Sequence, residues 1–317
     1  MDLTVSIVNH NGRQFLEKCI GSVFAAAGGM ECEVFVVDNC SEDGSAEFVR
    51  KEFPRVTLME NESRAGFAAN HNRVLRRAAG EFVLLLNNDT EVKPGALEAL
   101  VRFMRDNPGA GLAGPRLLNP DGTLQQSCFR TPTPGVLFFD AFFISSILPG
   151  NRVTGGYKKW AHDSMREVPS LSGACLIARA EAVRRVGPLD EDFFMYFEDH
   201  DWCARFRAAG WKVCFVPQAE VLHYGGGSEG ELGHDRFDRF YSSMDRYYEK
   251  HFGRSALPAV AALNVAGSAL RLAGWGAASI VSPGARNALK SRGPYFARRI
   301  KWYMKDKRSE FEIKTMD

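Results

Sequence analysis

The sequence predicts an α/β fold with a mainly parallel sheet, and three observations support this prediction. In the first half of the 317-residue chain, short apolar runs alternate with helix-like segments, as in successive βαβ units. Two of the apolar runs end in a carboxylate, Asp38 and Asp89. A hydrophobic content of 45% and a charged content of 25% are ordinary for a globular protein with a sizeable core. At roughly 150 residues per domain, the length allows about two domains.

The expected elements follow one another regularly up to residue 110. Strands are expected over residues 3–8, 33–37, 56–60 and 82–86, and helices over 13–27, 45–53, 68–79 and 95–106. Beyond residue 110, strands are expected over 174–178, 193–197, 213–216 and 219–223, and helices over 180–186, 199–209 and 235–252. The apolar segment 136–148 has the pattern of neither a clean strand nor a capped helix. Functional loops should lie at the carboxyl ends of the strands.

The charge is unevenly distributed, although the net charge is only +2. Residues 286–308 carry nine Lys and Arg against one Asp, whereas residues 1–285 have a net charge of −4. The uncharged residues 255–270 are fewer than the roughly 20 that a membrane span requires. We therefore expect residues 255–308 to lie on an anionic membrane or a partner, or alternatively to pack on their own domain. Nucleic acid binding is not expected, because few aromatic residues are interleaved with the cations.

The cysteine pattern and the N-terminus both favour an intracellular protein. The seven cysteines are scattered, odd in number and without a Cys-x-x-Cys pair, which indicates free thiols in a reducing compartment. No basic and then apolar leader precedes the first expected strand, so a cytoplasmic location is expected.

Residues 81–90, EFVLLLNNDT, combine a buried-strand pattern with polar side chains at its end. Such a strand delivers its last residues to the carboxyl edge of the sheet, where open α/β folds bind ligands. Asp89 would there be available to a hard divalent cation, or it caps the helix that begins near Pro94. Asp38 ends a second strand and could accept a hydrogen bond from a ribose or a base, or cap its own loop.

Two later segments carry reactive groups. Residues 198–201 place Glu198, Asp199 and Asp201 within four residues. Mutual repulsion tends to raise at least one carboxyl pKa, as a general base requires, although an acidic helix N-terminus capped by Asp199 is the alternative. His223 ends an apolar run and precedes three glycines. Its imidazole could bind a metal and the glycine N–H groups could approach phosphate oxygens, whereas a single His is more often a core residue.

Taken in order, these motifs resemble those of inverting glycosyltransferases of family 2, in particular the bacterial rhamnosyltransferase-like members. The matching segments are residues 5–11, 37–39, 61–70, 87–89, 172–174, 193–201 and 223–228. Their number and order make the resemblance specific for the family but not for the substrate.

The resemblance implies the GT-A fold, a nucleotide-sugar donor, and Mg²⁺ or Mn²⁺ as cofactor. It implies that Asp38 contacts the base or ribose, Asp89 and His223 bind the metal, Asp199 is the general base and Glu198 orients the acceptor. The remaining residues implied for the nucleotide-sugar pocket are Asn9, Asn11, Arg64, Gly66, Asn70, Asn88 and Gly173. One departure from the family pattern is that Asn87 and Asn88 leave Asp89 as the only carboxylate of its motif, which weakens the expected metal site.

The expected function is transfer of a sugar such as rhamnose from a dTDP- or UDP-linked donor to a glycan or lipid-linked acceptor, in cell-surface polysaccharide synthesis. Residues 1–230 would form the catalytic domain, with a nucleotide-sugar half (1–110) and an acceptor half (111–230). Residues 231–317 would form a helical extension with a basic tail, peripheral to the inner face of the membrane. Homo-oligomerisation stays open. The alternatives are a non-catalytic sugar-binding relative and a sugar nucleotidyltransferase, although residues 9–13 make a poor phosphate-binding loop.

Overall fold

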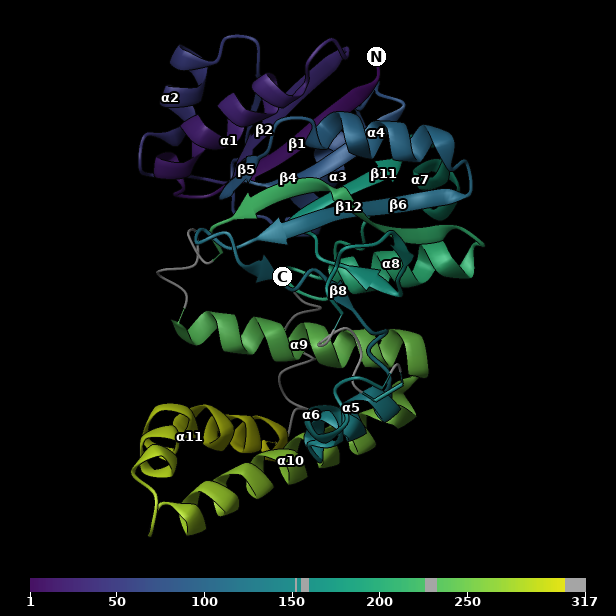
Figure 1. Ribbon diagram of the computed structural model, residues 1–317. Helices are drawn as coiled ribbons and strands as arrows, with labels where there is room; N and C mark the ends of the chain where they lie inside the picture. The colour runs from purple at the N-terminus through teal and green to yellow at the C-terminus, as the bar shows by residue number, and fades with distance from the viewer. Residues whose placement is uncertain (152, 155–159, 226–232, 306–317) are drawn as a thin grey trace. The chain divides into compact units, whose positions relative to one another are not determined.

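The computed structural model describes residues 1–151, 153–154, 160–225 and 233–305 (Figure 1). These residues form two compact units. The sheet unit consists of Met1–Thr131 and Trp160–Tyr247, and the helical unit consists of the described residues within Pro132–Lys159 and Tyr248–Asp317. Part of the expected acceptor half, residues 132–159, therefore belongs with the C-terminal helices.

The sheet unit contains the expected mixed α/β architecture with a parallel core. Within the described residues, its main sheet has ten strands in the order β3-β2-β1-β4-β11-β6-β12-β5, with β7 paired to β6 and β9 to β12, while β8 and β10 form a separate pair. The strands are β1 (Leu3–Asn9), β2 (Cys32–Asp38), β3 (Thr57–Glu60), β4 (Phe82–Asn87), β5 (Thr90–Val92), β6 (Ala110–Leu118), β7 (Leu124–Gln125), β8 (Cys128–Phe129), β9 (Arg166–Glu167), β10 (Ser170–Leu171), β11 (Cys175–Arg179) and β12 (Lys212–His223).

Strand β1 lies where the strand order reverses. The chain runs outward from β1 through β2 to β3, and then returns to β4 on the other side of β1, with all three pairings parallel. Open α/β sheets bind ligands outside the carboxyl ends of the strands at such a switch point. Asn9, Asp38 and Asn87 end β1, β2 and β4, so the topology brings three of the expected site segments to one edge.

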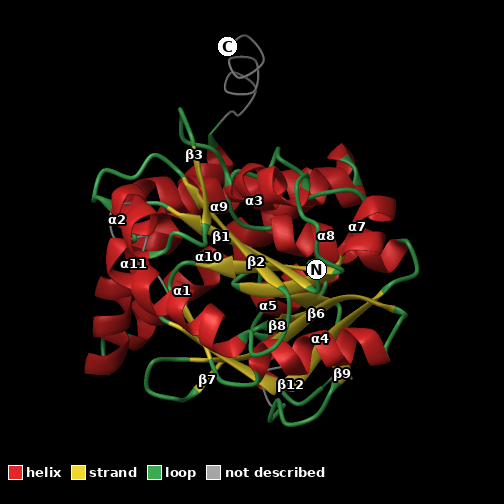
Figure 2. Ribbon diagram, turned by 90° about the horizontal axis from the view of Figure 1, so that it is seen from above, coloured by secondary structure: helices red, strands yellow, loops and turns green. Residues whose placement is uncertain are grey.

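Helices cover both faces of this sheet (Figures 1 and 2). The helices of the sheet unit are α1 (Arg13–Ala26), α2 (Ser45–Glu52), α3 (Phe67–Leu75), α4 (Ala96–Asp106), α7 (Ala180–Val186), α8 (Glu198–Ala208) and the first part of α9 (Gly233–Phe252). Alternate side chains of β2 point to opposite faces of the sheet. Val34 and Val36 belong to the core that α1 and α4 cover, whereas Phe35 and Val37 pack with Val74 of α3 on the other face. A strand buried on both faces reads as a continuous apolar run, which is why the sequence revealed it.

Residues 193–197 form a loop rather than the expected strand. Tyr196 and Phe197 have φ values of 71° and 66°, in the left-handed region that interrupts an extended chain. The aromatic side chains that suggested a strand serve the core instead. Phe193 is fully buried, and the Phe197 ring lies against those of Phe240 and Tyr247 in α9.

The expectations beyond residue 110 also missed β6 and a helix. β6 contains Gly111, Gly114 and Pro115, residue types that are typical of turns. Close packing accounts for the glycine at position 111, since a Cβ there would lie 2.6 Å from a ring atom of Phe206. Residues 213–216 and 219–223 form one strand, β12, with an irregularity in its pairing to β6 after Val216. The segment 136–148 contains α5 (Pro134–Ala141) and α6 (Ile144–Ile147).

The helical unit confirms the expected C-terminal helical region. Apart from α5, α6 and the end of α9, it contains a 3₁₀ turn (Arg254–Ala256), α10 (Leu257–Ala278) and α11 (Pro283–Met304). Two of these helices begin with side-chain caps. Thr133 accepts from the N–H of Val136 at the start of α5, and Ser282 accepts from the N–H of Ala285 at the start of α11. Each cap precedes a Pro, which is favoured in the first helical turn.

Candidate active site

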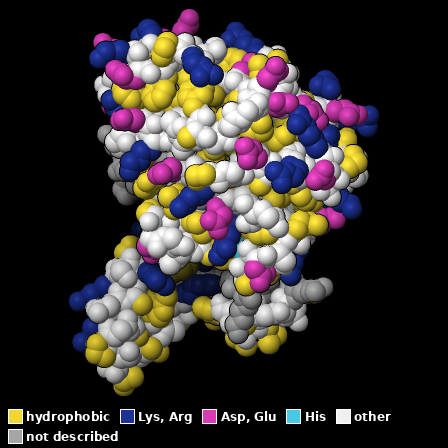
Figure 3. Space-filling view, turned by 45° about the horizontal axis from the view of Figure 1, so that its top comes forward, with side chains coloured by type: hydrophobic (Ala, Val, Ile, Leu, Met, Phe, Trp, Pro, Cys, Tyr) yellow, Lys and Arg dark blue, Asp and Glu magenta, His cyan; other side chains and the backbone are white. Residues whose placement is uncertain are grey.

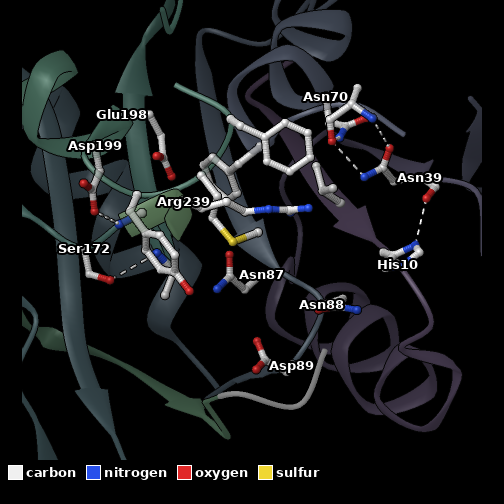
Figure 4. A pocket seen from close by; sticks show the side chains of 18 of the residues that line it. His10, Asn39, Asn70, Asn87, Asn88, Asp89, Ser172, Glu198, Asp199 and Arg239 are labelled. Atoms are coloured by element: carbon white, nitrogen blue, oxygen red, sulfur yellow. Dashed lines mark hydrogen bonds between the residues drawn. The ribbon is translucent and has the colours of Figure 1, made fainter. Parts of the chain in front are cut away.

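A cavity of about 500 Å³ opens at the carboxyl edge of the sheet unit (Figure 4). Its wall consists of the ends of β1, β4 and β12, the segments around residues 64–70, 172–174 and 194–199, and α9. Eight of the twelve predicted site residues line this cavity, namely Arg64, Asn70, Asn88, Asp89, Gly173, Glu198, Asp199 and His223. Asn9, Asn11, Asp38 and Gly66 do not line it. A cavity of this size can enclose a small-molecule ligand.

Asn9 connects the ends of three strands from behind the cavity. It is fully buried, and its Oδ1 accepts a hydrogen bond from Nδ2 of Asn88 at 2.6 Å. Its Nδ2 lies 3.3 Å from Oδ1 of Asp38 and 3.1 Å from Oγ of Ser41. Asp38 also accepts from the backbone N–H of Ser41 at 2.9 Å. Because buried amides are stable only when their polar atoms are paired, this network fixes the ends of β1, β2 and β4 relative to one another.

Asn11 shapes the neighbouring loop. Its φ of 49° is in the left-handed region, which asparagine tolerates better than most residues. Its Oδ1 accepts from the N–H of Glu42 at 2.8 Å, and its own N–H donates to Oγ of Ser41 at 3.0 Å. Asn11 therefore holds the loop that follows β2.

A second group of asparagines holds the segment that carries Arg64. Asn39 exchanges two hydrogen bonds with the backbone of Ala65, at 2.8 and 2.9 Å. Asn70 is fully buried and donates to the carbonyls of Ala65 and the next residue, at 3.1 and 2.9 Å. Asn61 joins the group by donating to Oδ1 of Asn39 and of Asn70, at 2.8 and 2.6 Å. The position of Arg64 beside the cavity thus depends on side chains that are themselves fixed.

Gly66 lets two loops of the cavity approach each other closely. A Cβ at this position would lie 2.6 Å from the carbonyl oxygen and 2.7 Å from the Cα of Phe194. The neighbouring N–H of Phe67 donates to the same carbonyl at 2.7 Å. The glycine is therefore required by backbone packing rather than by its own torsion angles.

Asp89 and His223 face each other at the cavity wall. Asp89 is buried, and its Oδ1 lies 3.3 Å from Nε2 of His223. Nδ1 of His223 lies 2.6 Å from Oε1 of Gln125, an atom that can only accept, so Nδ1 carries a proton. The Gln125 amide is oriented by its nitrogen, which donates to Oδ1 of Asn119 and to the carbonyl of His223 at 2.9 and 3.2 Å. Gln125 thereby directs Nε2 of His223 towards Asp89.

This pair matches an incomplete metal site. Within the described parts of the chain, no group of three or more His, Cys, Asp and Glu side chains could hold a metal ion. Mg²⁺ is, however, commonly held by one or two carboxylates together with substrate phosphates. One oxygen of Asp89 and one ring nitrogen of His223 therefore fit a cation that binds together with a diphosphate, and do not fit a closed protein-only metal centre.

Glu198 and Asp199 begin α8 and line the cavity. Asp199 accepts from the backbone N–H groups of Gly173 at 3.0 Å and His200 at 2.7 Å. Glu198 is buried, and its Oε2 has no hydrogen-bond partner among the described residues. Burial, and secondly the adjacent Asp199, raise the pKa of Glu198 well above its usual value. The two carboxyls thus have different environments, as neighbouring groups with different chemical roles require.

The structure adds three polar side chains that the sequence did not single out. His10, Arg236 and Arg239 line the cavity, and Arg239 lies 4.2 Å from the centre of the Phe194 ring. In Figure 4, Glu198 and Asp199 lie at one side of the view and His10, Asn39 and Asn70 at the other. Arg236 and Arg239 share a helix face by their spacing of three, but no sequence pattern indicates that this face borders the cavity.

The fold is that of the GT-A class. A solved structure with this fold is mannosyltransferase PcManGT from Pyrobaculum calidifontis, in complex with GDP-Man and Mn²⁺. It matches with a TM-score of 0.56 at 19% identity, over 96% of this chain and 88% of that one.

Sequence comparisons place the chain within this class. The model of Glycosyl transferase family 2 matches residues 4–146, and that of Glycosyl transferase family group 2 matches residues 82–253. The N-acetylglucosaminyl-diphospho-decaprenol L-rhamnosyltransferase of Mycobacterium tuberculosis (strain ATCC 25618 / H37Rv) is 32% identical over 72% of this chain and 78% of its own length. The low-salt glycan biosynthesis hexosyltransferase Agl10 of Haloferax volcanii is 24% identical over 70% of this chain and 67% of its own length. The chain belongs to glycosyltransferase family 2.

Replacement of Gly66 by Ala should destabilise the sheet unit and weaken nucleotide binding. The added methyl group would press on the backbone of Phe194, and such overpacking costs about 1–3 kcal/mol. The matched control is Gly21→Ala, in α1, where a Cβ meets nothing within 4 Å and the helix should gain about 1 kcal/mol. Urea unfolding and nucleotide titration measure both effects. Equal stability of the two variants would contradict the packing role.

Replacement of Glu198 by Gln should stabilise the protein at neutral pH. Since the folded-state pKa of Glu198 lies above the ordinary value of 4.5, the carboxyl contributes stability at low pH, and this contribution is lost as the pH rises through the folded-state pKa. The loss amounts to about 1.4 kcal/mol per pH unit between the two pKa values. The loss is measured as the difference in the free energy of unfolding between wild type and Glu198→Gln across this pH range. Glu17→Gln, at an exposed position, is the control. A constant difference between wild type and Glu198→Gln would refute the burial argument.

Proposed function

We propose that the protein transfers a sugar from a nucleoside diphosphate donor to a hydroxyl group, with inversion at the anomeric carbon. The observation that supports this most is the cavity itself, which has Asn39 and Asn70 at one side and Asp199 at the other, with Asp89, His223 and Arg64 also in its lining. Such a layout suits a nucleotide in one half and an acceptor in the other.

The donor would bind through the segments that the asparagine networks hold. Asp38, which the resemblance assigned to the ribose or base, is buried and does not line the cavity, so in this proposal it supports the cavity wall through Asn9 and Ser41. Arg64, Arg236 and Arg239 supply the positive charge that a diphosphate needs, and Arg favours phosphate because its fork of donors matches two oxygens at once. Asn70, Asn88 and Gly173 would complete this half, while Asn9, Asn11 and Gly66 act from behind the wall.

Asp89 and His223 are the residues that would hold Mg²⁺ or Mn²⁺. When bound, such a cation neutralises charge that develops on the leaving diphosphate. Since amides occupy positions 87 and 88, the protein contributes little negative charge there. The pair would therefore bind the metal most tightly when the donor is present.

Asp199 would act as the general base. Its carboxylate takes the proton of the acceptor hydroxyl as that oxygen forms a bond to the anomeric carbon, and the bond from this carbon to the diphosphate oxygen breaks on the opposite face. The hydrogen bonds from Gly173 and His200 would hold the carboxylate in position. Glu198, which retains its proton to higher pH than an ordinary Glu, can donate a hydrogen bond that orients the acceptor.

The relatives suggest the sugar and the acceptor. We propose rhamnose, or another hexose, from a dTDP- or UDP-linked donor, and a lipid-linked acceptor in cell-surface glycan synthesis, because a family relative is named for rhamnosyl transfer to a polyprenyl diphosphate sugar. Such an acceptor would place the protein on the inner face of the membrane, with residues 255–308 in contact with it. A thermal-shift panel of dTDP-rhamnose and several UDP-sugars, each with Mg²⁺ or Mn²⁺, tests the donor. No stabilisation by any nucleotide sugar would contradict the proposal and favour a non-catalytic relative.

Replacement of Asp199 by Asn should lower the rate of transfer by about 10²–10⁴-fold, the usual contribution of a general base. Donor affinity should change little, because the amide keeps the size of the side chain and can still accept from Gly173. Single-turnover transfer and calorimetric donor titration separate the two effects. Near-normal transfer by this variant would exclude Asp199 as the base.

Replacement of Gln125 by Leu should weaken metal-dependent donor binding by about 10–100-fold, the usual effect of losing the residue that orients a histidine ligand. Donor binding without metal should not change, because Gln125 does not line the cavity. The adjacent Gln126→Leu is the control, since Gln126 donates to the carbonyl of Cys128. Nucleotide titration with and without Mn²⁺ measures the difference. An equal loss without metal would indicate general damage to the site instead of a role in positioning His223.

A further inference from the structure

Exposed large hydrophobic side chains are concentrated in the helical unit. Among the residues that the structure describes, eleven of the thirteen lie there, and only Met1 and Met165 lie outside. The helical unit is less than a third of the chain, so size does not explain this. The most exposed are Ile280 and Val281, at 80% and 85%, in the turn between α10 and α11. Such concentrations mark interaction surfaces.

Helix α10 has the opposite polarity to a helix that packs on its own domain in water. Its buried residues are Val260, Asn264, Gly267 and Ser268, and the two polar ones are hydrogen-bonded. Asn264 donates to the carbonyl of Val260 at 2.9 Å, and Ser268 donates to that of Asn264 at 2.6 Å. Its exposed residues are all uncharged and mostly apolar, namely Pro258, Ala259, Ala262, Ala269, Leu270, Ala273, Gly274 and Ala277. A water-facing helix has its apolar stripe inside instead.

Burial also argues against α10 as a core helix. Within the described residues, the segment Arg254–Ala278 is long and apolar enough to cross a membrane by length and composition. However, only 22% of its most apolar 18-residue stretch is buried. Arg271, the charged residue within α10, is directed inward, where its guanidinium donates to the carbonyls of Ala141 and Asp140 at 3.0 and 2.7 Å. The exposed side of the helix therefore carries no charge.

Helix α11 supplies charge of one sign. Every charged residue from 253 to 305 is Arg or Lys. Those of α11 and the following residue are Arg286, Lys290, Arg292, Arg298, Arg299, Lys301 and Lys305. In Figure 3, the lower left part, which Figure 1 labels α10 and α11, shows hydrophobic side chains beside Lys and Arg side chains. An apolar face next to a basic one is complementary to an anionic lipid surface.

The pairing of the two helices excludes a membrane span by α10. The helices run antiparallel, because Ser268 accepts from Nε of Arg299 at 2.5 Å, while the ring of Trp275 contacts that of Phe296 at a centroid distance of 5.5 Å. A spanning α10 would therefore carry Arg299 and its neighbours into the hydrocarbon, where cationic side chains are costly. The hairpin can instead lie in the plane of the interface.

We propose that the α10–α11 hairpin, residues 257–304, binds the headgroup region of an anionic lipid bilayer. The uncharged side of α10 and the turn at Ile280 and Val281 enter the boundary of the acyl chains, and the cations of α11 contact the lipid phosphates. The inference rests on the proposed function only in that a lipid-linked acceptor would lie in the same membrane.

Vesicle sedimentation of the full-length protein tests this surface. Vesicles of phosphatidylcholine alone are compared with vesicles that also contain phosphatidylglycerol, at low and high salt. We expect binding to the anionic vesicles at low salt only. The double variant Ile280→Asp/Val281→Asp should lower the affinity by roughly tenfold or more, through lost apolar burial. The double variant Lys290→Glu/Arg292→Glu should also lower the affinity for anionic vesicles, here through electrostatic repulsion, and this reduction should become smaller as the salt concentration rises.

The control is Met165→Asp, which places one negative charge on an exposed hydrophobic residue of the sheet unit and should leave vesicle binding unchanged. Wild-type protein that ignores anionic vesicles, or a turn variant that binds like wild type, would overturn the proposal. A dimer that the turn variant abolishes, without any vesicle binding, would show a protein interface instead and would also overturn it. The thermal shift with nucleotide sugars should persist in every variant, so failure of the donor site is recognised separately.

Discussion

The candidate site depends on one constraint, namely that three parallel strands end side by side and leave polar groups there without access to water. Asn9 satisfies this constraint because an amide both donates and accepts, so that it bonds to Asn88 and to Asp38 while fully buried. An aliphatic or purely accepting side chain would leave one partner unpaired, at about 1–3 kcal/mol. In the loop that carries Arg64, Asn39 and Asn70 likewise pair with polar backbone groups. The cavity wall is therefore largely fixed before a ligand arrives, which favours precise binding.

The opposite side of the cavity is organised by charge. Glu198 is buried next to Asp199 and its Oε2 has no hydrogen-bond partner among the described residues, whereas both oxygens of Asp199 accept from backbone N–H groups. Burial, and secondly the adjacent Asp199, raise the pKa of Glu198, so the two neighbouring carboxyls have different environments. Three arginines line the same cavity.

The sequence was most informative where local pattern and topology agree. Strands β1, β2 and β4 are largely buried on both faces, so their apolar runs predicted them, and the parallel order then implied that Asp38 and Asp89 lie at one edge of the sheet. The sequence was less informative where tertiary contacts decide. The aromatic residues 193–197 fit a strand by composition, but left-handed torsions at Tyr196 and Phe197 turn them into core side chains of a loop. Gln125, Arg236 and Arg239 carried no local signal, because their importance arises from neighbours distant in the sequence.

The helical unit follows a different physical rule from the sheet unit. In the sheet unit, the core is apolar and buried polar side chains such as Asn9 and Asn70 are hydrogen-bonded, as is usual in water. In α10, polar residues such as Asn264 and Ser268 are buried and paired while the uncharged side is exposed, as an apolar surrounding requires. Residues 1–285 are net negative and would be repelled by anionic lipid, so attraction must come from a separate basic element. The cations of α11 supply it, and the exposed side of α10 makes the contact depend on apolar burial as well as on charge.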